Sequence, residues 1–152
     1  MANTSETGRR TPIQTAALAT GAVFLLVGIL GFIPGITSNY SELGAAGPTS
    51  EALLLGFFQV SILHNVVHLL FGVAGIAMAR TATQARNFLV GGGIVYLILW
   101  LYGLLVPHDS AANFVPMNAA DNWLHLVLGL GMIVLGVVLA RGVTVRSRTA
   151  RT

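Results

Sequence analysis

Three histidines and one aspartate have types and spacings that could bind a metal ion. His64 and His68 are four residues apart. Asp121 and His125 repeat this spacing. Residues i and i+4 of an α-helix lie on one face, so each pair would present two ligands side by side. Imidazole binds zinc, copper and iron, and a carboxylate adjusts the charge of such a site. If the pairs face one another, the four side chains form a candidate site for one of these ions.

The two pairs lie in longer segments that match at a constant offset of 57 residues. The matched residues are Asn65 with Asn122, His68 with His125, and Gly72 with Gly129. The match predicts two helical hairpins in parallel orientation, related by an approximate two-fold axis along the membrane normal. Asn65 and Asn122 would then lie beside the site as hydrogen-bond partners of its ligands.

Other interpretations of these residues need no metal ion. The histidines could hydrogen-bond across helices and serve only to hold them together. Asn118 and Asp121 have the spacing of a capping box, which would place the carboxylate in the first turn of a helix. A third interpretation is a haem with His68 and His125 as axial ligands, which would leave His64 and Asp121 without a role.

Four apolar segments must position these residues. The chain of 152 residues is 55% hydrophobic and 9% charged, and its mean hydropathy is +0.79. These values favour a lipid environment over a soluble fold. The expected spans are residues 14–33, 52–79, 87–106 and 119–140. Each is expected to be helical, because a helix satisfies its own backbone in hydrocarbon.

The expected fold is therefore all-α, a four-helix transmembrane bundle in a single domain. That domain covers residues 14–140 and contains repeats at about 14–80 and 87–140, with polar tails at 1–13 and 141–152. The spans contain many of the chain's 18 glycines. Small residues of this kind let helices in lipid approach closely. We expect most of them to serve packing, with room for a flat cofactor beside Gly72 and Gly129 as the alternative.

All eight basic residues are arginines, and they predict the orientation of the chain. They precede the first span, lie between the second and third, and follow the fourth: Arg9, Arg10, Arg80, Arg86, Arg141, Arg146, Arg148 and Arg151. The positive-inside rule then places both termini in the cytoplasm and both long loops outside. Arginines at helix ends indicate contact with lipid headgroups rather than with nucleic acid. The absence of cysteine excludes disulfides and thiolate metal sites.

Several segments together resemble a bacterial family of small four-helix membrane proteins known as domain of unknown function 4383. The segments are residues 31–37 (GFIPGIT), 63–69 (LHNVVHL), 91–97 (GGGIVYL), 100–103 (WLYG) and 113–125 (NFVPMNAADNWLH). The resemblance covers most of the chain between about residues 16 and 140. It implies a multi-pass protein of the bacterial inner membrane, and it implies no activity or catalytic residue.

The leading hypothesis for function is a binding or structural membrane module that can hold a transition-metal ion. A second hypothesis is a small oxidoreductase component that carries haem or a metal and exchanges electrons with quinone. A third is a structural subunit of a larger membrane complex or of a homo-oligomer. No catalytic residue is expected.

Overall fold

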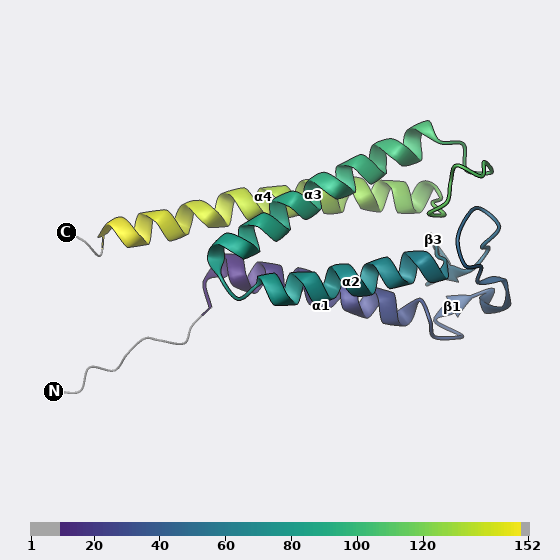
Figure 1. Cartoon of the computed structure of the whole chain (residues 1–152), viewed down its shortest axis with the longest axis horizontal. Coiled ribbons are helices and arrows are strands. Elements are labelled where there is room, and N and C mark those ends of the chain that lie inside the picture. Colours follow the sequence, from purple (N-terminus) through teal and green to yellow (C-terminus); the bar gives the residue numbers. More distant parts are fainter. Residues whose placement is uncertain (1–9, 150–152) are drawn as a thin grey trace.

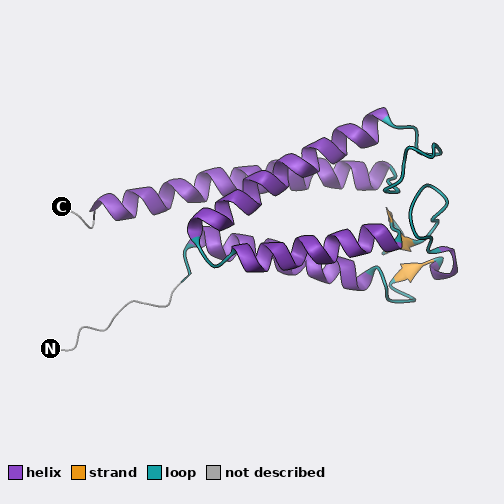
Figure 2. Cartoon of the chain, viewed as in Figure 1, coloured by secondary structure: helices purple, strands orange, loops and turns teal. Residues whose placement is uncertain are grey.

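Four α-helices form two antiparallel hairpins (Figures 1 and 2). The structure is a computed structural model that describes residues 10–149, with side chains as far as Arg141. The first hairpin is α1 (Pro12–Leu30) with α2 (Ile62–Met78), and the second is α3 (Ala82–Leu105) with α4 (Ala119–Thr149). The expected tail residues 1–9 and 150–152 lie outside the described part of the chain.

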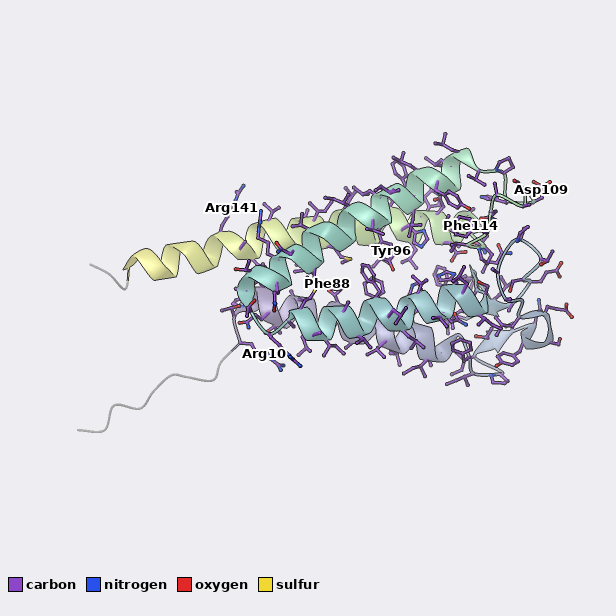
Figure 3. All side chains as sticks on the ribbon, viewed as in Figure 1. Arg10, Phe88, Tyr96, Asp109, Phe114 and Arg141 are labelled. Atoms are coloured by element: carbon purple, nitrogen blue, oxygen red, sulfur yellow. The ribbon has the colours of Figure 1, made fainter. Side chains whose placement is uncertain are left out.

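The two ends of the bundle differ in charge. Both ends of the described chain lie at the same end of the bundle as the short α2–α3 turn, which α4 extends well beyond, and the two long connections lie at the opposite end (Figure 1). Figure 3 shows Arg10 and Arg141 at the first end, and Asp109 and Phe114 at the second. We call these the arginine end and the loop end. The labelled arginines therefore lie at one end of the bundle, and the labelled aspartate lies at the other.

Three of the four helices are long and apolar enough to cross a membrane, namely α1, α3 and α4 as far as Arg141. The fourth, α2, has 17 residues and is shorter. Large apolar side chains are exposed on the helices, including Leu70 at 65% and Val127 at 66%. Such exposure is unfavourable in water and ordinary in lipid. The helices thus have the length and the surface of a membrane protein.

The expectation that residues 52–61 belong to the second helix is wrong. Helix α2 begins at Ile62, where the Ser61 hydroxyl caps it by accepting a hydrogen bond from the His64 N–H at 3.1 Å. The preceding residues turn back at Leu55 and Gly56, whose φ angles are 54° and 76°. An apolar run fits a buried strand as well as a helix, and hydropathy alone does not separate the two.

These residues instead build a small cap over the loop end. Strands β1 (Thr37–Ser38), β2 (Leu53–Leu54) and β3 (Phe58–Gln59) form an antiparallel sheet in the order β1-β2-β3. A short 3₁₀ helix, η1 (Tyr40–Glu42), lies between β1 and β2. The cap has its own core of buried Ala52, Leu54 and Val60, packed against the end of α1. The loop end of the first hairpin is thus closed by extended chain.

The remaining helix boundaries differ from expectation at their ends. Helix α1 starts at Pro12, where Thr11 and Gln14 form a capping box. The Gln14 side-chain amide also donates to the carbonyls of Ala79 and Arg80, at 3.2 and 2.7 Å, and so ties α1 to the end of α2. Helix α4 continues to Thr149 where a polar tail was expected after residue 140.

Glycines let the two helices of each hairpin pack backbone against backbone. A Cβ atom placed on Gly72 would lie 2.6 Å from the Leu25 nitrogen and 2.8 Å from the Gly21 oxygen. A Cβ on Gly93 would lie 2.7 Å from the Gly129 oxygen. Side chains cannot enter contacts this short, so these positions serve close packing. A Cβ on Gly91 would meet nothing within 4 Å.

We predict that Gly93→Ala destabilises the protein by about 1–3 kcal/mol, because the added methyl group overpacks the α3–α4 contact. Gly91→Ala is the matched control from the same helix turn, and it should leave stability unchanged or slightly raised. Thermal unfolding of the purified protein in detergent measures both. Equal melting temperatures for the two variants would contradict this account of the glycines.

Candidate functional site

One small cavity between the hairpins brings together the four candidate ligands. His64 and His68 reach it from α2, and Asp121 and His125 reach it from α4. Its volume is about 90 Å³, which is room for an ion with bound water or for several water molecules. The remaining lining is apolar and comes from the cap and the helices: Val27, Leu54, Leu55, Phe58, Val60, Leu124 and Leu128. We call this cavity the histidine chamber.

The two histidines of α2 are held by backbone carbonyls. His64 Nδ1 lies 3.1 Å from the Gln59 oxygen, and His68 Nδ1 lies 3.1 Å from the His64 oxygen. A carbonyl oxygen can only accept, so Nδ1 carries the proton in both rings and Nε2 keeps its lone pair. The ring centroids are 4.5 Å apart. Metal-binding histidines are commonly oriented by a hydrogen bond of this kind.

Asp121 joins the second hairpin to the cap. Its Oδ2 accepts hydrogen bonds from the backbone N–H groups of Asn118 and Gln59, both at 3.0 Å. The Asn118 side chain in turn accepts from the Asp121 N–H at 3.0 Å. This reciprocal pair is the capping box expected from the sequence. The carboxylate therefore caps α4 and also holds a strand of the cap.

Gln59 connects the two halves of the chamber through its own peptide groups. Its N–H donates to Asp121 of α4, and its carbonyl accepts from His64 of α2. The Asn118 side chain adds a second link by donating to the Phe57 carbonyl at 2.7 Å. Gln59 is one of the residues to which the sequence allowed the histidines to hydrogen-bond, but its backbone groups, rather than its side chain, make these bonds.

His125 is buried and incompletely paired. It is 3% exposed, and its Nδ1 has no hydrogen-bond partner. A buried polar atom without a partner costs about 1–3 kcal/mol and calls for an explanation. The ring packs edge-on against Tyr96, with centroids 5.3 Å apart. Of the three chamber histidines, His125 is the one that no hydrogen bond fixes in orientation.

A row of aromatic rings crosses the seam between the hairpins. His68 contacts Phe24 at 5.7 Å, and Phe24 stacks on Tyr96 at 5.2 Å with an interplanar angle of 11°. Tyr96 then contacts His125. Phe24 of α1 and Tyr96 of α3 thus make matching contacts with the matching histidines. The sequence indicates this correspondence by a second constant offset, of 72 residues, between Phe24 and Tyr96. The same offset pairs Gly21 with Gly93 and Gly31 with Gly103.

Asn65 and Asn122 lie away from the chamber, inside their own hairpins. A Cβ on Gly31 would lie 2.1 Å from Asn65 Oδ1, and a Cβ on Gly103 would lie 2.3 Å from Asn122 Oδ1. Each amide therefore packs on a glycine of the neighbouring helix. Neither asparagine lines the chamber or hydrogen-bonds to its histidines in the described chain.

The structure leaves no room for a haem where the sequence suggested it. Gly72 and Gly129 are covered by the backbones or side chains of α1 and α3. Phe24 and Tyr96 fill the space between His68 and His125. A porphyrin would have to displace the central aromatic pair. Gly72 and Gly129 therefore serve helix packing rather than making room for a porphyrin.

Comparison with known proteins gives the family of the chain. The model of a family described as a domain of unknown function (DUF4383) matches residues 14–138. The chain belongs to this family. The resemblance noted in the sequence is thereby confirmed. No curated protein and no solved structure matches the chain. Because the family description states no function, function has to be argued from the site.

As a metal site, the histidine chamber is incomplete in this conformation. Among the described residues, no group of three or more histidine, aspartate or glutamate side chains is placed so that it could hold an ion. The closest pair of rings is His64 and His68, and His125 and Asp121 approach from the opposite hairpin. Chelation by the chamber therefore requires a change of side-chain conformation.

We predict that Asp121→Ala lowers the free energy of unfolding by about 1–3 kcal/mol, because it leaves the N–H groups of Gln59 and Asn118 without an acceptor. Asp121→Asn retains one oxygen acceptor and should lose less. The control is Asp109→Ala, which changes an exposed carboxylate of the same end. Thermal unfolding in detergent compares them, and equal losses for Asp121→Ala and Asp109→Ala would refute the proposed role of Asp121 in holding the cap.

Proposed function

We propose that this protein is a membrane-embedded binding module whose histidine chamber holds one transition-metal ion. The observation that carries the proposal is the convergence of three imidazoles and one carboxylate on a single small cavity lined otherwise by apolar groups. Buried polar groups in a membrane protein are retained at a cost. A bound cation would offset that cost.

His64 and His68 would provide the fixed part of the site. Their Nδ1 atoms are occupied by carbonyls, so their Nε2 lone pairs are available to one ion. His125 would provide the third ligand by rotating its unpaired ring toward them. Staggered rotamers give such a ring a small set of discrete alternative positions. Asp121 would balance the charge of the ion, and three imidazoles with one carboxylate suit zinc, copper or iron.

The proposal predicts one bound ion per chain and a ligand-dependent gain in stability. A ligand that binds only the folded state stabilises it by about 2.7 kcal/mol at a free concentration of a hundred times Kd. Elemental analysis of the purified protein, calorimetric titration with zinc or copper, and thermal unfolding measure these quantities. His125→Ala should abolish most of the stabilisation by the metal, because His125 is the imidazole ligand that α4 contributes to the site.

His108→Ala is the matched control, since His108 lies in the exposed α3–α4 connection and does not line the chamber. It should bind metal as the unaltered protein does. If the unaltered protein carries no metal and shows no thermal shift with zinc or copper, the proposal fails. If His108→Ala removes binding and His125→Ala does not, the ion binds at the surface and the chamber is not its site.

We further propose that the arginine end faces the cytoplasm and that the two hairpins are duplicated units. The placement of Arg10 and Arg141 at one end supports the orientation (Figure 3). The matching contacts of Phe24 with His68 and of Tyr96 with His125 support the duplication. The chamber would then open toward the external side, on the seam between the two units.

The orientation can be tested with single cysteines, because the chain has none. Ala111→Cys lies in the exposed α3–α4 connection, and Thr83→Cys lies at the exposed start of α3. A membrane-impermeant maleimide added to intact cells should label the first and spare the second until the cells are opened. The reverse labelling pattern would place the arginine end outside.

A further inference from the structure

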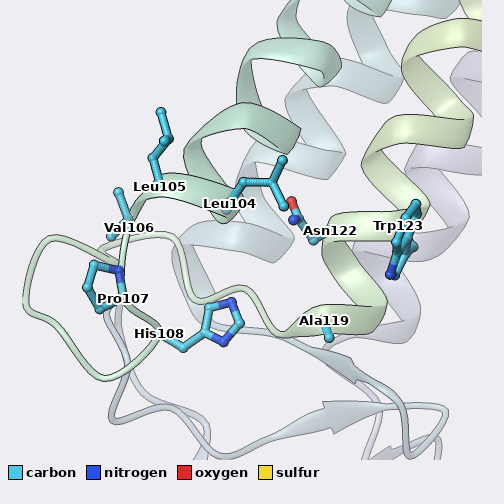
Figure 4. A pocket seen from close by; sticks show the side chains of 9 residues that line it. Leu104, Leu105, Val106, Pro107, His108, Ala119, Asn122 and Trp123 are labelled. Atoms are coloured by element: carbon cyan, nitrogen blue, oxygen red, sulfur yellow. The ribbon is translucent and has the colours of Figure 1, made fainter.

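A second cavity lies at the loop end of the other hairpin, between the end of α3 and the start of α4. It is an open groove of about 430 Å³ (Figure 4). Its apolar lining is Leu104, Leu105, Val106, Pro107, Ala119 and Trp123. Leu105 is 80% exposed and Trp123 is 66% exposed. The groove is therefore continuous with the apolar surface that faces lipid, and an acyl chain can lie along it.

The helix end that lines the groove has backbone carbonyls to which no backbone N–H donates in the described chain. Helix α3 ends at Leu105, and its last bond runs from the Val106 N–H to the Tyr102 carbonyl at 2.9 Å. Pro107 has no N–H to offer to the carbonyl of Gly103. In the described chain no backbone N–H reaches the carbonyls of Leu104 or Leu105 either. A helix C-terminus with free carbonyls attracts positive charge.

Asn122 adds a buried acceptor to the same groove. The residue is 6% exposed, lines the groove, and its Oδ1 has no hydrogen-bond partner. In Figure 4 its amide reaches from α4 toward α3 beside Leu104. This unpaired amide oxygen lies against Gly103 in the last turn of α3, and it calls for a hydrogen-bond donor at this end of the helix.

Apart from His108, which lines the groove, the ionisable side chains around it carry charge of one sign. The arginines of the described chain lie at the arginine end, and the chain has no lysine. The loop end instead carries Asp109 beside the groove, and Glu42 and Glu51 in the cap. An anionic head group would be repelled here, whereas a cation is attracted.

We propose that this groove binds a phospholipid whose head group carries a primary ammonium. The ammonium would donate its N–H groups to the free carbonyls of α3 and to Asn122, and the acyl chain would lie against Leu105 and Trp123. A primary ammonium has three donors, and a quaternary choline head group has none. The preference therefore comes from hydrogen bonding as well as from charge. The inference does not rest on the metal proposal, because the groove and the chamber have no lining residue in common.

Native mass spectrometry of the full-length protein tests this preference. The probes are phosphatidylethanolamine, phosphatidylcholine and phosphatidylglycerol with identical acyl chains, added one at a time. We expect the unaltered protein to retain phosphatidylethanolamine about tenfold more strongly than the other two, since hydrogen bonds to a charged group are among the stronger ones. Equal retention of the three lipids would overturn the proposal.

Two variants locate the bound lipid. Ala119→Trp fills the groove from an exposed position and should remove the preference. Ile62→Trp, at the corresponding first residue of α2, is the matched control and should keep it. Asn122→Leu keeps the size of the side chain but removes the acceptor, so it should reduce the preference for ethanolamine over choline. If Ala119→Trp and Ile62→Trp behave alike in a folded protein, the lipid binds elsewhere and the proposal is wrong.

Discussion

The close approach of helices at their glycines is the constraint on which the rest of the structure depends. Gly72 packs on the backbone of α1, and Gly129 packs beside Gly93 of α3. Each of these glycines lies four residues after a chamber histidine, on the same face of its helix. The contact at the glycine fixes how far the two helices are shifted along one another, and this shift determines which side chain the histidine contacts. His68 meets Phe24 and His125 meets Tyr96 as a result. The two aromatic rings then stack across the seam and join the hairpins.

The cap covers the loop end of the first hairpin and connects it to the second hairpin. Helix α2 is too short to carry the first hairpin to the level of the loop end, and extended chain takes its place. The peptide groups of Gln59 then bond to both hairpins at once. Backbone that is not helical is tolerated at such depth only where protein groups satisfy it. Asp121 and His64 meet that requirement, so the polar residues of the chamber also have a structural role.

The two cavities differ in what they can recognise. The histidine chamber is small and lined by imidazoles with free lone pairs, which suits an ion. The groove is open to the lipid-facing surface and combines free carbonyls with apolar walls, which suits an amphiphile. Both lie at the end that lacks arginines, where acceptor groups and carboxylates predominate. An excess of hydrogen-bond acceptors and carboxylates is thus common to the whole loop end.

Composition and spacing determined the membrane class, the number of helices, the family, and the i, i+4 pairs at His64 and Asp121. These features are local, since hydropathy and helix periodicity depend only on neighbouring residues. Tertiary structure alone decided that residues 52–61 are a cap, that Asn65 and Asn122 pack on glycines, and that Gln59 bridges the hairpins. Such outcomes depend on backbone groups that are distant in the sequence. The packing of the helices sets which of these groups meet, and the type of a residue does not predict what its backbone will bond to.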